Sequence, residues 1–229
     1  MNRITLLAAV SALSLFGAAA QASTIDTTPF WDGASSISAF GGNATGVYGE
    51  TFVAPGGDLT DYTFYVNTGA PLDVVGQVYA WDGSLTGGSS PQGAVGPALF
   101  TSAQFTIDAG RGFQAVTVNT GSLALTAGQH YVALLADVNP NDFGSASWGD
   151  ILFSHPGVAG DGGFNFYNND HTTGSINANA WDSFNDFGSL AWTANFTGGG
   201  APEPAEWALM VLGFGGAGAM LRRRAALAA

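Results

Sequence analysis

Turn-forming residues interrupt this chain at short intervals. Their close spacing restricts the possible fold more than any other feature of the sequence. Between Ser23 and Thr197, Gly, Asn, Asp, Ser and Thr recur about every ten residues. No stretch between these interruptions keeps the apolar period of an amphipathic helix. Short segments separated by frequent turns are typical of antiparallel β domains. We therefore predict that the body of the chain is all-β.

Alternating side chains mark the clearest of the predicted strands. Within Leu59–Asn67, the residues Tyr62, Phe64 and Val66 share one face. Leu190–Thr197 alternates in the same way, with its larger apolar residues inward. The other predicted strands are Val47–Ala54, Leu72–Trp81, Leu99–Ile107, Phe113–Asn119, His130–Val138, Asp150–His155 and Gly163–Tyr167. This number of short strands predicts an antiparallel two-sheet sandwich, jelly-roll-like, over residues 23–197.

A short pattern before one strand supports the same fold. The spacing Leu125-x-x-Gly128-x-x-Tyr131 is similar to the tyrosine corner of β-sandwich domains. In that corner a tyrosine at the start of a strand bonds its hydroxyl to the backbone of the preceding connection. We expect Tyr131 to do the same.

The charge balance excludes one class of partner. From Ser23 to Ala201 there are fifteen acidic residues and one basic residue, Arg111, and the whole chain has no lysine. Binding to nucleic acid needs Lys and Arg against phosphate, so no nucleic-acid partner is expected. The chain also has no cysteine, so the domain must be held together by its core alone.

The sequence carries none of the usual catalytic signatures. It has no G-x-S-x-G, no H-E-x-x-H and no phosphate-binding glycine loop. His130, His155 and His171 do not show metal-ligand spacing. We therefore predict no catalytic residues and no enzymatic activity, although an unmarked pair of carboxylates of the glycosidase kind stays open as an alternative.

One acidic segment has the composition of a calcium loop. Side-chain oxygens stand at alternate positions in Asp137, Asn139 and Asn141, with Asp142 directly behind. The glycine and the distal glutamate of an EF-hand are missing, and Trp148 stands where that glutamate would be. An Asx-rich turn explains the same residues, so Ca²⁺ is an open alternative and no cofactor is certain.

Aromatic residues in polar surroundings suggest a sugar-binding face. Trp148, Trp181, Tyr167 and Asn169 lie in stretches rich in Asn, Asp and Gly. Exposed aromatic rings beside amide and carboxylate groups suit carbohydrate, so these four residues are candidate glycan-binding residues. The alternative is that the two tryptophans close the ends of the sandwich, because Trp is usually mostly buried.

The first twenty-two residues have the form of a signal peptide. Arg3 supplies the positive charge, a small apolar stretch follows, and Ala20-Gln21-Ala22 is an A-x-A cleavage site. The mature protein is expected to begin at Ser23. The expected partners at this step are the Sec translocon and signal peptidase, which implies export across the inner membrane.

The last part of the chain has its own organisation. A glycine-rich linker, residues 198–201, leads to Pro202-Glu203-Pro204. Trp207–Leu221 is then almost wholly apolar and ends at Arg222, Arg223 and Arg224. Fifteen residues span about 22 Å as a helix, which is short against a bilayer core of about 30 Å. A short helix of this kind, smooth with glycine, suits capture by a membrane enzyme better than permanent anchoring.

These residues together resemble the PEP-CTERM sorting signal over residues 202–229. The resemblance is carried by the triplet, by Trp207, by Gly213 and Gly215 around Phe214, and by the arginine cluster. It implies recognition by an exosortase, a membrane transpeptidase of Gram-negative bacteria, then loss of a transient membrane tether. It also implies a cell-surface location in bacteria that make exopolysaccharide and biofilm. The expected role is therefore structural or adhesive within extracellular polysaccharide, with a calcium-dependent carbohydrate-binding module as the alternative.

Overall fold

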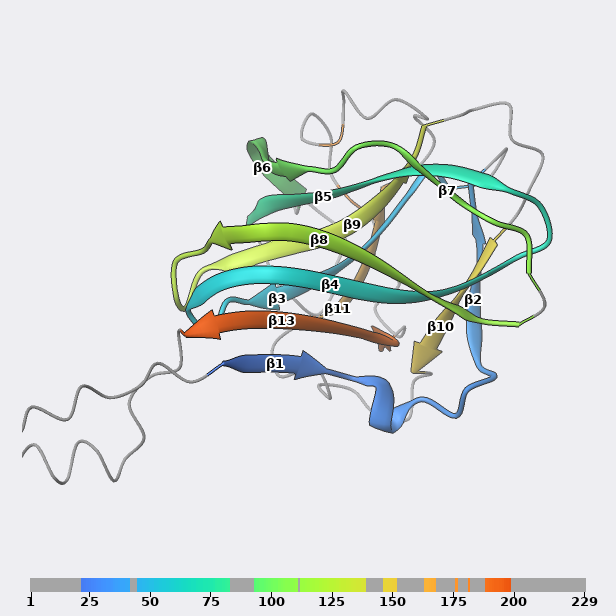
Figure 1. Cartoon of the computed structure of the whole chain (residues 1–229), viewed down its shortest axis with the longest axis horizontal. Coiled ribbons are helices and arrows are strands. Elements are labelled where there is room, and N and C mark those ends of the chain that lie inside the picture. Colours follow the sequence, from blue (N-terminus) through green and yellow to red (C-terminus); the bar gives the residue numbers. More distant parts are fainter. Residues whose placement is uncertain are drawn as a thin grey trace, which may run out of the picture.

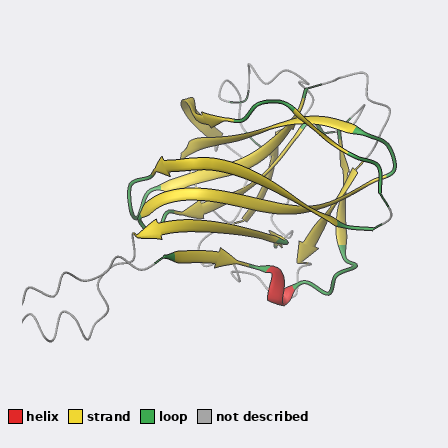
Figure 2. Ribbon diagram, viewed as in Figure 1, coloured by secondary structure: helices red, strands yellow, loops and turns green. Residues whose placement is uncertain are grey.

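The body of the protein consists of two antiparallel β-sheets. The computed structural model describes residues 22–41, 45–82, 93–110, 112–138, 146–151, 163–167, 176, 181 and 188–198. One 3₁₀ turn, η1 (Thr28–Phe30), accompanies the strands (Figures 1 and 2). Within these ranges no helix has the length and apolar character needed to cross a bilayer. The expected signal peptide up to residue 21 and the expected sorting signal with its helix, 207–221, lie outside the described residues.

The larger sheet is built around β4. Its members are β1 (Ser23–Asp26), β2 (Ser36–Phe40), β4 (Gly57–Thr68), β8 (Gln114–Ala124), β10 (Ala146–Ile151), β12 (Ser189–Leu190) and β13 (Trp192–Gly198). The strands β8, β4, β13 and β1 lie side by side in that order (Figure 1). Farther along β4, β10 takes the place of β13, with Trp148 opposite Val66.

The smaller sheet faces the larger one. Its members are β3 (Val47–Val53), β5 (Leu72–Asp82), β6 (Gly93–Thr101), β7 (Phe105–Ile107), β9 (His130–Asp137) and β11 (Gly163–Tyr167). Their order is β11-β3-β9-β5-β6, and β7 also pairs with β5. The chain changes sheet between β3 and β4, between β4 and β5, and between β8 and β9. The predicted all-β, two-sheet antiparallel sandwich is thus confirmed.

Several strand boundaries differ from those predicted. The single strand expected from Leu99 to Ile107 is two strands, and β6 starts earlier, at Gly93. The register of β6 against β5 shifts because Val78 pairs with Phe100 while Ala80 pairs with Val95. The intervening residues of β6 form a bulge, because Pro97 has no N–H to give to the ladder and its neighbour Gly96 has a positive φ of 69°. The alternation of apolar residues alone does not reveal such a bulge.

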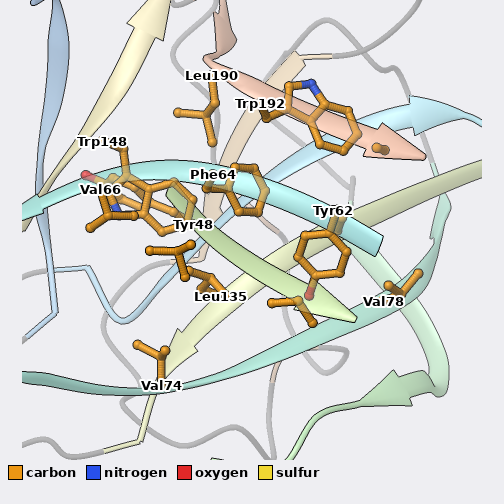
Figure 3. Packing of buried hydrophobic residues seen from close by; sticks show 14 of the residues in the cluster. Tyr48, Tyr62, Phe64, Val66, Val74, Val78, Leu135, Trp148, Leu190 and Trp192 are labelled. Carbon is orange, nitrogen blue, oxygen red and sulfur yellow. The ribbon is translucent and has the colours of Figure 1, made fainter. Parts of the chain in front are cut away.

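The main core lies between the two sheets. The predicted inward faces are confirmed: Tyr62, Phe64 and Val66 have no exposed surface, and Leu190, Trp192, Ala194 and Phe196 are also buried. Phe64 packs between two tryptophans (Figure 3), with ring centroids 4.7 Å from Trp148 and 5.9 Å from Trp192. This aromatic cluster joins β4, β10 and β13 in a chain that has no cysteine.

Tyr62 connects the two sheets through its hydroxyl. From β4 it reaches across the core to the smaller sheet, where its hydroxyl lies 2.9 Å from the Leu134 carbonyl oxygen and 3.2 Å from that of Gln77. Gly76 makes room for it, because a Cβ there would lie 2.7 Å from the Tyr62 hydroxyl. Burial raises the pKa of Tyr62 well above its usual value. Burial also raises the pKa of Tyr48 to about 12.

Because the pKa values of Tyr48 and Tyr62 are raised by burial, we expect the folded protein to lose stability at alkaline pH. Below the usual tyrosine pKa of 10.0, both are protonated whether the chain is folded or unfolded. Above it the unfolded chain releases these protons while the folded protein keeps them, so the free energy of unfolding falls as pH rises from about 10. No lysine titrates in the same range. Urea unfolding at pH 8, 10 and 11 measures the effect, and the double variant Tyr48→Phe, Tyr62→Phe is expected to show a smaller slope. Equal slopes in the variant and the wild type would contradict this account.

The predicted tyrosine corner is present. The hydroxyl of Tyr131, at the start of β9, accepts a hydrogen bond of 3.0 Å from the backbone N–H of Thr126. Gly128 has a φ of 76° in the connection between them, a conformation that favours glycine. The corner fixes how the chain leaves β8 in the larger sheet and enters β9 in the smaller one.

A second apolar cluster covers the outer face of the smaller sheet. It includes Val75, Tyr79 and Trp81 of β5 together with Val132 and Leu134 of β9. Ile176 and Trp181, from the segment after β11, belong to the same cluster and are buried. The central strand β5 is therefore covered on both faces, as its two-sided apolar pattern predicts.

Candidate functional site

Trp148 is a core residue, so the prediction that it forms an exposed sugar-binding face is wrong. It has no exposed surface, and its ring contacts Phe40, Tyr48 and Phe64. The strand that contains it, β10, begins four residues before the predicted start at Asp150. Within β10 the pairing with Val66 directs Trp148 inward, because directly opposed residues point to the same side of a sheet.

Trp181 is also buried, which contradicts its predicted exposure. It is 3% exposed, its indole N–H donates a 2.9 Å hydrogen bond to the Ile176 carbonyl, and its ring meets the edge of Trp81 at 5.4 Å. The backbone of Tyr167 pairs with Val47 at the end of β11, and nothing is described of its side chain. Asn169 lies outside the described residues. Two of the four glycan-binding candidates, Trp148 and Trp181, are therefore buried.

The proposed calcium loop is only partly within the described residues. Asp137, the last residue of β9, is 1% exposed, and its N–H donates to the Gly46 carbonyl. Asn139, Asn141 and Asp142 lie outside the described ranges. Among the residues that the structure describes, no three His, Cys, Asp or Glu side chains are grouped as metal ligands would be. A rise in melting temperature on adding Ca²⁺ remains the test of this hypothesis.

The predicted cleavage point coincides with the start of β1. Ser23 is the first residue of β1, and Ala22 precedes it as an exposed residue outside any strand. Ser23 pairs with Phe196 near the end of β13. Ala20 lies outside the described residues, as do the sorting-signal residues Pro202, Glu203, Pro204, Trp207, Gly213, Gly215, Arg222, Arg223 and Arg224.

Sequence reasoning did not identify the outer face of the larger sheet, here named the open face. Its described residues come from β1, β13, β4 and β8, from the loop after η1 and from the turn before β8: Thr24, Asp26, Thr193, Asn195, Asp61, Thr63, Tyr65, Thr117, Asn119, Trp31 and Phe113. Thr24, Asp26, Thr117 and Asn119 are exposed, and most of the others are half-buried. The outer face of the smaller sheet, by contrast, is apolar and covered.

At one end of the open face an aromatic group is held in place. Trp31 packs between Tyr65 and Phe113, at centroid distances of 5.3 and 4.9 Å. Its indole N–H donates a 2.8 Å hydrogen bond to the Ser35 carbonyl. The ring lies against β10 at Gly149, where a Cβ would come within 2.8 Å of it. Trp31 is therefore fixed on several sides but still partly exposed.

At the other end a row of polar side chains crosses three strands. The hydroxyl of Thr24 donates to the amide oxygen of Asn195 at 3.0 Å, and the amide nitrogen of Asn195 donates to Asp61 at 2.7 Å. Between the row and the aromatic group, Thr63 and Thr117 share a hydroxyl hydrogen bond of 2.8 Å. These bonds orient the polar groups before any ligand arrives.

Comparisons with protein-family models, with curated proteins and with solved structures found no match to this chain.

Proposed function

We propose that this protein is an exported, non-enzymatic cell-surface protein with a structural or adhesive role in extracellular polysaccharide. In this proposal a signal peptide directs it across the inner membrane of a Gram-negative bacterium. A PEP-CTERM-like signal, Pro202-Glu203-Pro204 with the apolar segment and arginines behind it, then brings it to an exosortase. The sandwich is a jelly-roll-type module that remains after both ends are processed.

The observation that carries the proposal is where the two targeting segments join the sandwich, at Ser23 and after Gly198. Ser23, expected as the mature N-terminus, starts β1 and lies opposite Phe196, two residues before β13 ends at Gly198. Both processing segments thus join the sandwich at one end of the β1–β13 pair. Removal of either leaves every strand of the body intact, as expected if the folded domain is the working product.

The strand order supports the jelly-roll part of the proposal. One sheet contains the run β1-β13-β4-β8 and the other the run β3-β9-β5-β6. The first and last strands are neighbours, and strands that follow each other along the chain are repeatedly divided between the sheets. Crossings of this kind are typical of double-sheet jelly rolls, so the strand order favours that topology.

Replacement of the triplet tests the sorting step. The variant Pro202→Ala, Glu203→Ala, Pro204→Ala is expected to stay in the membrane fraction with its C-terminal segment uncleaved. The wild type is expected to lose that segment and to leave the membrane fraction. Fractionation followed by immunoblotting measures the two forms. A matched variant, Thr197→Ala, alters an exposed residue near the end of β13 and is expected to behave like the wild type. Normal release of the triplet variant would refute the sorting role.

A further inference from the structure

We infer, taking the ligand class from the proposed function, that the open face binds neutral polysaccharide chains. Trp31 and the polar row formed by Thr24, Asn195 and Asp61 are the main contacts. This site does not include Trp148 or Trp181, the two glycan-binding candidates from the sequence that are buried in the structure. Among the described residues, Ile176 and Trp181 lie over the outer face of the smaller sheet, whereas the open face has exposed side chains that a polymer can reach.

Trp31 provides a ring that is already positioned for stacking. The C–H surface of a pyranose ring packs against aromatic faces, and Trp offers the largest such area. Because Phe113, Tyr65 and the bond to Ser35 hold the indole, little side-chain freedom is left to lose on binding. Gly149 leaves room for the Trp31 ring, because a Cβ at this position would collide with it.

The polar row provides groups that match sugar hydroxyls. Asn195 and Asp61 present amide and carboxylate oxygens in fixed orientations, and a carboxylate has about four acceptor positions, so those of Asp61 are not all filled by its partners Asn195 and Thr60. Hydroxyls of threonine can both donate and accept. From Tyr65 to Asp61 the strand covers about 13 Å, which is longer than one pyranose ring. A linear chain lying along β4 can therefore contact the aromatic group and the polar row together.

The negative charge of the open face favours neutral polysaccharides over anionic ones. Its described residues carry the carboxylates of Asp26 and Asp61 and no cationic side chain. An anionic polymer would be repelled, and the chain as a whole has a net charge of −12. The ligand class that fits is a neutral polysaccharide rich in hydroxyl groups.

Affinity electrophoresis of the mature protein, taken from the surface of the producing cells, tests this site. Gels contain hydroxyethylcellulose, galactomannan or dextran as neutral polymers, or polygalacturonate as an anionic one. The wild type is expected to be retarded by at least one neutral polymer and not by polygalacturonate. Trp31→Ala and Asn195→Ala are each expected to weaken that retardation about tenfold. Leu99→Ala, which alters an exposed apolar residue on the smaller sheet, is the matched control and should bind as the wild type does.

The outcomes separate the site from the broader proposal. Absence of retardation in all three neutral polymers overturns the inference, and so does undiminished binding by both open-face variants. Circular dichroism identifies any variant that does not fold. If Trp31→Ala fails to fold, Asn195→Ala keeps the test decisive, because Asn195 is partly exposed and lies outside the apolar core. Protease treatment of intact cells reports surface exposure independently. A surface-exposed protein that binds none of these polymers would reject this site while leaving the sorting role in place.

Discussion

Trp148→Ala should lower the free energy of unfolding by about 3–5 kcal/mol, the usual cost of removing a large buried ring. Trp148 has no exposed surface and packs against Phe40, Tyr48 and Phe64. The neighbouring strands cannot close the resulting cavity, because these rings are held by β2, β3 and β4. A domain of this size has only about 5–15 kcal/mol of stability, so the variant should unfold at much lower denaturant concentration.

Urea unfolding followed by tryptophan fluorescence measures this effect. Asn119→Ala serves as the control, since this residue of β8 is exposed on the open face and should change stability by less than about 0.5 kcal/mol. If Trp148 were an exposed sugar-binding residue, its replacement would leave the unfolding midpoint where it is. That result would mean that β10 is not placed as described.

Trp181→Ala should also be strongly destabilising, by about 3 kcal/mol or more. Its ring packs against Trp81 on the outer face of the smaller sheet, and its indole N–H donates a hydrogen bond to the Ile176 carbonyl. Loss of the ring uncovers apolar side chains of β5 and β9, such as Tyr79 and Val132. An increase in ANS fluorescence at native pH should therefore accompany the lower stability, because the dye binds exposed apolar surface.

Phe30→Ala provides the comparison for Trp181→Ala. Phe30 is an aromatic residue of η1 and is 48% exposed, so its removal should have little effect on stability or on ANS binding. Equal behaviour of the two variants would show that the second apolar cluster contributes nothing to the fold.

The sequence predicted the fold where side-chain alternation was complete. The faces of Tyr62, Phe64 and Val66 followed from period-two patterning alone, and the Tyr131 corner followed from its spacing to Gly128. Such signals are local, because neighbouring residues of one strand must point to opposite sides of the sheet.

The site was harder to predict because burial depends on residues distant in sequence. Trp148 looks like a loop residue when only its Ser, Gly and Asp neighbours are considered, yet pairing with β4, some eighty positions earlier, turns it inward. Trp31 could not be recognised as an outer-face residue, since its partners Tyr65 and Phe113 come from β4 and the turn before β8. Trp192 lies in a strand with complete alternation, and the prediction that it faces inward is confirmed.

The intact mass of the mature protein, isolated from the cell surface, tests the central claim most directly. The account predicts a chain that begins at Ser23 and ends near the Pro202-Glu203-Pro204 triplet, so that both targeting segments are absent and β1 and β13 remain complete. A surface protein whose mass still includes Arg222, Arg223 and Arg224 would contradict it, because the tail would then be a permanent anchor instead of a processed sorting signal.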